Sequence, residues 1–310
     1  MRITLISTLT AIILGCSSCF TGIESTPKIT RADAIRAGVG TTDEQRFAQT
    51  IAAEAPAKWT AGKQWKVSDD KIGIIFAGAP VSAQNLAGKF ITLRDVRPVT
   101  NITGEEDMEL TFVGPDWQSL TYRTGISATD WKNRKSVEIP FAVEMGPVNY
   151  ADSLMRGETF YITTPSWFYG DGQQLRGLRH IPVHIERVEA GTSLYPLKVV
   201  FTPREGDDHH EYYLLLTYGN APSATRNFEK YFSFANPRKR YPQITDETWA
   251  RIVRSQVQYG MTRDEVRLAF GAPNRVEKGT SQGSMQMERW SYDDGVYLIF
   301  EDGYLNSFRR

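Results

Sequence analysis

Two stretches of this sequence have residue types that could support catalysis or metal binding. Gly279-Thr280-Ser281-Gln282-Gly283 fits the Gly-x-Ser-x-Gly pattern of a hydrolase nucleophile, which needs a strand before the serine and a helix after it. We expect neither here, because the stretch is rich in Gly, Ser and Thr, and we predict a flexible loop. His180 and His184 flank Pro182 in an alternating pattern that predicts a strand, with both imidazoles on one face. Only Glu186 lies at ligand spacing, so two ordinary strand histidines are favoured over a metal pair.

Other sequence signals give no support for an enzyme or a cofactor. Asp207-Asp208-His209-His210-Glu211 lies between two apolar runs, which predicts a solvated hairpin loop with adventitious metal binding at most. The sequence has no Walker loop, no dinucleotide glycine fingerprint and no paired-cysteine site. We therefore expect no catalytic residue, no metal and no cofactor. A hydrolase that uses Ser281 and the histidines is the weakest of the hypotheses kept open.

Aromatic residues near predicted turns are the better candidates for binding. They are Trp117, Trp131, Trp167, Phe168 and Tyr169. Exposed aromatic side chains often form binding sites, although packing of loops onto a sheet would explain the same positions. The charge balance, Lys+Arg 36 against Asp+Glu 36, argues against nucleic acid as the partner.

The N-terminus has the layout of an export signal. Arg2 is followed by an apolar run that reaches Gly15, and this run is shorter than the ~20 residues that span a bilayer. Residues 1–15 are thus predicted to be a signal peptide, and a buried N-terminal helix is the alternative. Cys16 and Cys19 are the chain's two cysteines, so the rest of the chain has no disulfide.

Ile13-Leu14-Gly15-Cys16 resembles the bacterial lipobox. This resemblance implies that Cys16 carries diacylglycerol, an anchor that holds the chain stably at a membrane. Ser17 and Ser18 lack the acidic residue that retains enteric lipoproteins at the inner membrane, which favours the outer membrane. We expect residues 16–29 to be a lipidated tether.

The body of the chain is predicted to be helical at first and then β-rich. Residues 30–57 read as two helices, 30–38 and 42–55, the second with a capping box at Thr42 and Gln45. Strand patterns then dominate, and they repeat in two units, residues 58–150 and 151–236. Residues 62–67 match 157–162, Leu86-Ala87-Gly88 and Ile91 match Leu175-Arg176-Gly177 and Ile181, and residues 110–125 match 199–219. The alternative is that two unrelated β regions share an apolar alternation.

A basic segment bracketed by prolines, residues 237–243, is predicted to be a linker to a last domain, residues 244–310. Here Thr245 starts a helix that we expect to end at Gly260, and Thr262 with Glu265 caps a second one. Strands are predicted at 285–292, 296–300 and 304–308, joined by Asp-Gly turns.

The last domain resembles the SmpA/OmlA (BamE-like) family. The motifs are Gly260-Met261-Thr262, Phe270-Gly271-Ala272-Pro273, Trp290-Ser291-Tyr292 and Leu298 to Leu305. They cover about the last fifth of the chain. The resemblance implies an ααβββ fold and a lipoprotein that takes part in outer-membrane assembly.

The predicted fold class is α+β, with N-terminal helices, two duplicated sandwich- or barrel-like β units and a C-terminal BamE-like domain. The predicted function is that of a non-catalytic, membrane-anchored envelope lipoprotein that binds another envelope protein. A glycan- or peptidoglycan-binding lipoprotein is the alternative.

Overall fold

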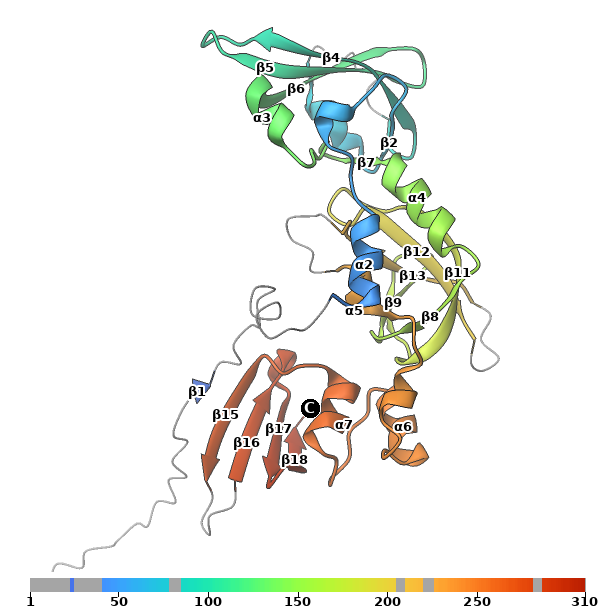
Figure 1. The fold of residues 1–310 in the computed structure, drawn as a ribbon, viewed down its shortest axis with the longest axis vertical. Helices are drawn as coiled ribbons and strands as arrows, with labels where there is room; N and C mark the ends of the chain where they lie inside the picture. The colour runs from blue at the N-terminus through green and yellow to red at the C-terminus, as the bar shows by residue number, and fades with distance from the viewer. Residues whose placement is uncertain are drawn as a thin grey trace, which may run out of the picture. The chain divides into compact units, whose positions relative to one another are not determined.

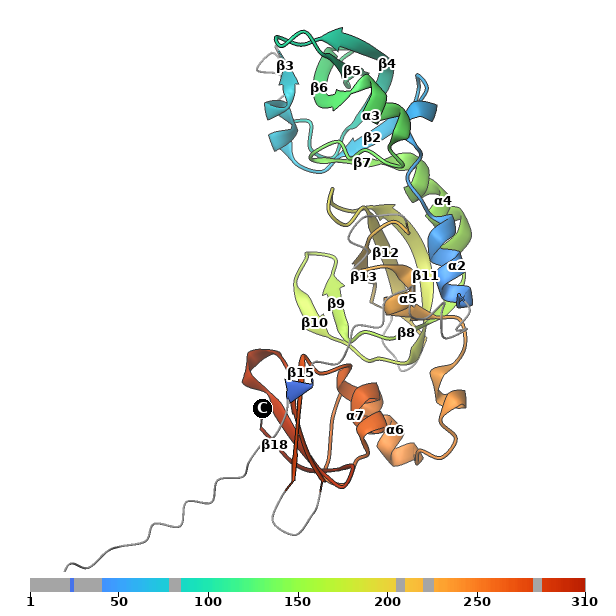
Figure 2. The same ribbon diagram turned by 60° about the vertical axis from the view of Figure 1, so that its left-hand side comes forward.

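The computed structural model describes residues 23–24, 41–77, 85–204, 210–219, 226–280 and 286–309 (Figures 1 and 2). The chain forms two compact units, residues 38–255 and residues 256–310 together with 1–37. The described part is a mixture of antiparallel sheets and a few helices, none of which is long and apolar enough to cross a membrane. Cys16, Ser281, residues 205–209 and the helix expected at 30–38 lie outside the described residues.

The unit of residues 38–255 contains two antiparallel sheets. The first sheet has the strand order β3-β6-β5-β4-β2-β7. Its strands are β2 (Gln64–Val67), β3 (Phe76–Ala77), β4 (Phe90–Thr100), β5 (Glu106–Val113), β6 (Ser119–Ser127) and β7 (Ala142–Glu144). Helix α3 (Ala128–Asn133) and two 3-10 turns, η1 (Pro56–Lys58) and η2 (Asp70–Ile74), accompany it. Alternate residues such as Ile91 and Leu93 are buried in its core, as a pleated strand with one covered face requires.

The second sheet has the strand order β10-β9-β13-β12-β11-β8-β14. Its strands are β8 (Thr159–Ile162), β9 (Ser166–Tyr169), β10 (Gln174–Arg176), β11 (Ile181–Ala190), β12 (Leu197–Pro203), β13 (Tyr212–Leu216) and β14 (Phe232–Ser233). Helix α4 (Met145–Met155) leads from β7 to β8, and α5 (Phe228–Tyr231) precedes β14 (Figure 1).

The first helix of the described chain, α2 (Asp43–Thr50), packs on α5. Its predicted capping box is present, with the Thr42 hydroxyl accepting from Gln45 N and the Gln45 side chain accepting from Thr42 N. The helix ends at Thr50 and not at Ala55, because Ile51 takes an extended conformation and is buried in the core of the second sheet.

The segment expected to be a linker is an ordered turn. Pro237–Arg240 forms a 3-10 helix, η4, and the Arg238 guanidinium donates to the carbonyl oxygens of Tyr241 and Ile244. Helix α6 (Asp246–Val253) follows, capped by Thr245 as expected. It ends well before Gly260, because Ser255 takes a positive φ of 54°.

The unit of residues 256–310 consists of helix α7 and the C-terminal sheet. Helix α7 (Arg263–Phe270) has the predicted capping box, and Gly271, at a φ of 88°, ends it. The sheet has the order β1-β15-β16-β17-β18, where β1 is Ile23–Glu24. The other strands are β15 (Arg275–Thr280), β16 (Gln286–Ser291), β17 (Tyr297–Glu301) and β18 (Tyr304–Arg309), with the 3-10 turn η5 (Asp293–Gly295) before β17.

Strands β16, β17 and β18 confirm the three predicted strands, whereas β15 was not predicted. Its sequence, Arg-Val-Glu-Lys-Gly-Thr, is polar, and among Arg275 to Gly279 only Val276 is buried. A weak apolar alternation of this kind gives little sequence signal for a strand. The expectation that no strand precedes Ser281 is therefore wrong, although β16 and not a helix is the next described element.

Candidate functional site

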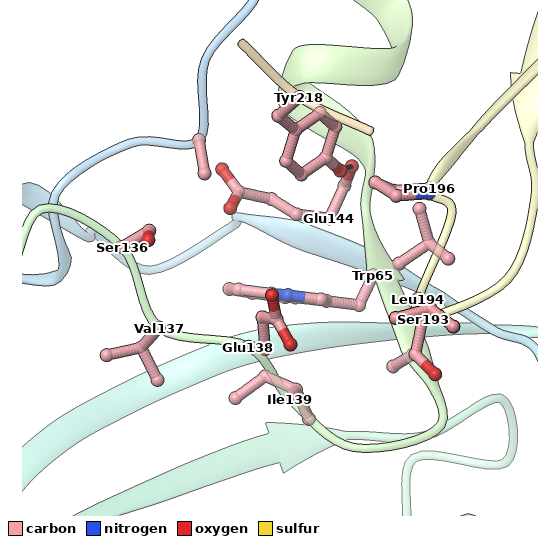
Figure 3. A pocket seen from close by; sticks show the side chains of 13 residues that line it. Trp65, Ser136, Val137, Glu138, Ile139, Glu144, Ser193, Leu194, Pro196 and Tyr218 are labelled. Atoms are coloured by element: carbon pink, nitrogen blue, oxygen red, sulfur yellow. Dashed lines mark hydrogen bonds between the residues drawn. The ribbon is translucent and has the colours of Figure 1, made fainter. Parts of the chain in front are cut away.

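A cleft between the first and the second sheet is a candidate site of the unit of residues 38–255 (Figure 3). It contains about 500 Å³ of empty space, including the part that opens to solvent. We call it the junction cleft and define it by Trp65, Val137, Glu138, Glu144, Leu194 and Tyr218. Trp65 and Glu144 are paired residues of β2 and β7, and Tyr218 follows β13, so both sheets build the cleft.

A buried ion pair lies at the cleft wall. Glu144 is 5% exposed, and its Oε1 is 2.6 Å from Lys63 Nζ. Lys63 Nζ also contacts Glu54 Oε2 at 2.8 Å and lies 5.7 Å from the ring centres of Trp59 and Trp65. Burial raises the pKa of the Glu144 carboxyl above its ordinary value, while the hydrogen bond and the charge of Lys63 oppose this rise. The pair therefore keeps a charge in a place where an unpaired carboxylate would be costly.

Tyr218, which follows β13 of the second sheet, contacts the backbone of Glu144. Its hydroxyl donates to the carbonyl oxygen of Glu144 at 3.1 Å. Burial, together with the charges of Glu144 and Glu138, holds the pKa of the Tyr218 phenol well above its ordinary value. The phenol thus stays protonated and keeps its donor role at any physiological pH.

The geometry of the cleft favours hydrogen bonding over stacking. Figure 3 shows Glu138, Glu144 and the Tyr218 hydroxyl around it, groups that accept hydrogen bonds from hydroxyl-bearing or cationic molecules. Trp65 is 1% exposed and is covered by its T-shaped contact with Phe112. Although Trp65 lines the cleft, its ring is therefore almost wholly buried in the core.

Two of the five aromatic residues proposed for binding are buried. Trp131 lies in α3 and makes a T-shaped contact with Trp59, at 5.3 Å between ring centres. Trp167 lies in β9, is 3% exposed and donates through Nε1 to the Thr164 carbonyl oxygen at 2.8 Å. The expectation that these side chains are exposed is wrong for both, because each ring fills a sheet core.

The other three aromatic residues lie at the surface to different degrees. Trp117 is 89% exposed at the turn between β5 and β6, and its φ of 60° is unusual for a large side chain. Tyr169 is 40% exposed. Phe168 is half-buried and stacks on Tyr213, at 5.4 Å and an interplanar angle of 22°. The structure does not gather the five into one patch, since Trp117 belongs to the first sheet and Tyr169 to the second.

His180 and His184 were both expected in one strand, and this is wrong for His180, which lies outside β11. The two histidines occupy different surroundings. His184 lies in β11, as predicted, opposite Thr159 and Thr202. His180 precedes β11 at a φ of 61° and faces Trp249 of α6, at 5.6 Å between ring centres. Among the described residues, no three His, Cys, Asp or Glu side chains lie close enough together to hold a metal ion. Glu211, from the predicted hairpin loop, is bound by Arg187 through two contacts of 2.7 and 2.8 Å.

Three aromatic residues along one edge of the C-terminal unit, two of them exposed and Phe308 half-buried, were not found from the sequence. Tyr259 is 67% exposed and Tyr304 is 57% exposed, and the Tyr259 ring lies 5.2 Å from that of Phe308. Gly260 N donates to Leu305 O and Leu305 N donates to Met261 O, so the segment before α7 runs along β18. We call the edge formed by this segment and β18 the tyrosine patch, with Tyr259, Tyr304 and Phe308 as its aromatic residues. Phe308 lies opposite the buried Leu298 and Tyr304 lies opposite Glu301, so these two side chains point to opposite faces of the sheet. The signal in the sequence was Tyr beside a turn glycine, at Tyr259-Gly260 and Gly303-Tyr304.

Comparison with known proteins identifies no relative. No protein-family model matches the chain, and neither a curated protein nor a solved structure matches it. The function must therefore be argued from the residues and their geometry.

Proposed function

We propose that this protein is an envelope lipoprotein that is anchored through lipid on Cys16 and acts by binding another protein of the envelope. The tyrosine patch carries the protein-binding part of this proposal. Large aromatic side chains are enriched at protein interfaces. Tyr259 and Tyr304 are mostly exposed to solvent and are not covered by the core of the unit. The signal-peptide and lipobox patterns support the anchor.

The form of the C-terminal unit agrees with the proposed SmpA/OmlA-like domain. A capped helix, α7, is followed by the antiparallel strands β16, β17 and β18, with Trp290 and Phe300 in contact in the core at 4.5 Å between ring centres. In the structure, α6 belongs to the unit of residues 38–255, and β15 adds a strand that the resemblance did not imply. We propose outer-membrane assembly or maintenance as the process that this unit serves.

We also propose that the two sheets of the other unit are copies of one ancestral unit, and their registers support this. Gly62 N donates to Leu93 O as Gly157 N donates to Ile185 O, both at 2.8 Å. Leu93 and Ile185 each precede a bulge, opposite Phe112 and Phe201.

The strands that flank these matched strands correspond as well. β7 pairs with β2 as β14 pairs with β8, and β3 pairs with β6 as β9 pairs with β13. By its pairing, Ile91 corresponds to Val183 and not to Ile181. Strand β10, which lies outside β9, has no counterpart in the first sheet. A shared turn glycine, a shared bulge and two shared flanking pairings support a common origin of the two sheets.

The protein-binding proposal is tested by crosslinking in intact cells. We would compare the full chain, a chain ending at Ser255 and a Tyr259→Ala/Tyr304→Ala variant, with Tyr150→Ala as the control because Tyr150 is 46% exposed on α4. We expect the full chain and the control to capture components of outer-membrane assembly, and the other two chains to lose them. Equal capture by the patch variant would contradict the proposal.

The anchor is tested separately. We expect Cys16→Ser to move the protein from the membrane fraction to the soluble fraction, and mass spectrometry of the wild type to show acyl chains on Cys16. Cys19→Ser is the matched control and should leave the protein in the membrane fraction. A wild-type chain without acyl groups would refute the anchor.

A glycan-binding lipoprotein is the second candidate, and Trp117 is the observation that favours it. Holding a tryptophan at a φ of 60° costs conformational energy, and such positions are often kept for function. An exposed indole can stack on a sugar ring. Binding to purified peptidoglycan should be lost in Trp117→Ala and weakened in Tyr169→Ala, while Tyr150→Ala leaves it unchanged. Binding that survives both substitutions would remove this candidate.

A further inference from the structure

A short piece of the N-terminal segment belongs to the C-terminal sheet. Strand β1, Ile23–Glu24, pairs antiparallel with β15, with Ile23 opposite Glu277 and Glu24 opposite Val276. The other side of β15 is paired with β16 along its whole length. Strand β1 therefore covers part of the edge that β15 would otherwise expose. Strand β1 and residues 256–310 accordingly belong to the same compact unit.

We propose that β1 is a strap that holds the C-terminal unit at the membrane surface. This inference rests on the proposed lipid at Cys16. It adds that the C-terminal unit is held close to the membrane that the lipid enters. Ile23 is seven residues from Cys16 (23 − 16 = 7), and seven extended residues span at most ~25 Å. The paired edge strand β15 lies one strand spacing of ~4.8 Å farther on, and thus within roughly 30 Å of Cys16.

Covalent connectivity alone would not impose this position. Gln256, where the C-terminal unit resumes, is 240 residues from Cys16 along the chain (256 − 16 = 240). With β1 paired to β15, only the residues between Cys16 and Ile23 separate the lipid from this unit. The tyrosine patch belongs to the same unit and lies on β18, at the opposite edge of the sheet, four strand spacings or about 19 Å from β1. The strap would therefore keep the patch within roughly 45 Å of Cys16, in reach of a partner that is itself in the membrane. The kind of partner that fits is an integral membrane protein with a surface close to the lipid headgroups.

The pairing itself is tested by a disulfide in the full lipidated chain, with Cys19→Ser in all variants. Residues directly opposite each other in an antiparallel pair have Cβ atoms ~4.5–5.5 Å apart, close to what a disulfide needs. Ile23→Cys/Glu277→Cys should form a disulfide under mild oxidation. Ile23→Cys/Lys278→Cys is the matched control, because neighbouring residues of a strand point to opposite faces, and it should form far less. Equal disulfide yields in the two variants, or no disulfide in Ile23→Cys/Glu277→Cys, would overturn the strap.

The position at the membrane is tested by energy transfer in vesicles. A donor dye on Asn306→Cys, an exposed residue of β18, is paired with acceptor lipids that carry the dye on their headgroups. A flexible insert of about twelve residues after Phe20 lengthens the reach by ~40 Å and should reduce the transfer.

Loss of the pairing should act in the same direction. Ile23→Pro/Glu24→Pro removes the backbone N–H groups of β1 and should reduce the transfer, whereas Ile23→Ala/Glu24→Ala keeps them and should not. Transfer that is the same in all of these chains would overturn the inferred position.

These outcomes separate the strap from the anchor. If the wild-type chain carries no acyl group but the Ile23→Cys/Glu277→Cys disulfide forms, the lipoprotein proposal fails and the strap remains as a contact within the unit. If the chain is acylated and the disulfide does not form, the strap fails and the anchor stands.

Discussion

Glu144 is a carboxyl group whose protonation is linked to the stability of the fold. Its pKa is raised by burial above the ordinary value of 4.5, with Lys63 acting in the opposite direction. Between the ordinary and the raised pKa the folded state binds more protons than the unfolded state, so stability falls as the pH rises through that window. Glu144→Gln has no such group to ionise.

As the pH rises from about 4.5, we therefore expect the unfolding free energy of the wild type to fall relative to that of Glu144→Gln. Urea denaturation at a series of pH values measures this difference. Parallel curves for the two proteins would show that burial does not perturb Glu144.

Glu109 has the opposite linkage. It is 4% exposed in β5 and lies between Arg97 of β4 and Arg123 of β6, at 2.8 and 3.2 Å. The hydrogen bond from Arg97 is the largest cause that lowers its pKa. The ionised Glu109 stabilises the folded state fully above its ordinary pKa. This stabilisation is lost as the pH falls through the lowered pKa of the folded protein.

Glu109→Gln should therefore destabilise the protein near neutral pH and remove part of its loss of stability in acid. Glu106→Gln, an exposed carboxylate on the same strand, is the control and should change little. The same pH series reports both variants. A Glu109→Gln curve that keeps the full acid loss would contradict this linkage.

At the residue scale the sequence could predict caps but not the junction cleft. Thr42 with Gln45 and Thr262 with Glu265 act over three residues, so their spacing is visible in the sequence. Lys63 and Glu144 are 81 residues apart (144 − 63 = 81), and they meet because β2 pairs with β7. Burial of Trp131 and Trp167 likewise depends on which face of an element meets the core.

Among the elements, β9 and the turn after β10 depend on a glycine. A Cβ on Gly177 would lie 2.2 Å from the Trp167 ring. Gly177→Ala should thus displace a buried indole and cost about 1–3 kcal/mol of stability. Gly170→Ala, where a Cβ would meet nothing within 4 Å, is the control and should stay within about 0.5 kcal/mol of wild type. Thermal unfolding of the two variants measures this difference in stability. Equal melting temperatures of Gly177→Ala and Gly170→Ala would contradict the close contact between Gly177 and Trp167.

The cap of α7 gives a second prediction at this scale. Thr262 accepts from Glu265 N, and the Glu265 carboxylate accepts from Thr262 N at 2.7 Å. Thr262→Ala should cost about 1 kcal/mol, and Thr262→Ser should retain most of the stability. Hydrogen exchange at the backbone amides of α7 in the full chain measures the loss. Identical exchange rates for the Ala and Ser variants would contradict the role of the cap.

Strands with a strong apolar alternation were predictable, and elements fixed by distant contacts were not. Strands β16, β17 and β18 contain buried Trp290, Leu298, Phe300 and Leu305 between turn residues. Strand β15 is polar, and its place in the sheet comes from pairing with β16 and β1. Helix α6 stops at Val253, although the apolar stripe continues to Val257, because Ser255 has left the helical conformation.

For the whole molecule, the boundary between the compact units follows Ser255. Arg179 N donates to Val253 O at 3.0 Å, and Arg176 Nη2 donates to Ser255 O at 2.9 Å. Arg238 lies over the ring of Trp249, at 5.3 Å. These contacts fix α6 to the unit of residues 38–255.

A chain of residues 38–255 should therefore fold by itself, and a chain of residues 38–243 should be less stable. The two lost backbone acceptors contribute about 1 kcal/mol each, which corresponds to a melting temperature lower by roughly 4–8 °C in a unit of this size. Circular dichroism during heating measures the difference. Equal melting temperatures would place α6 outside this unit.

The edges of the two larger sheets bear on how the protein behaves at high concentration. The strands at those edges, β3, β7, β10 and β14, are two or three residues long, while the long strands β4 and β11 lie inside. A long open edge can pair with another molecule and start a fibre. Two or three residues offer too few free backbone groups for such pairing. The arrangement thus protects a strand-rich protein from aggregation when many copies are crowded together.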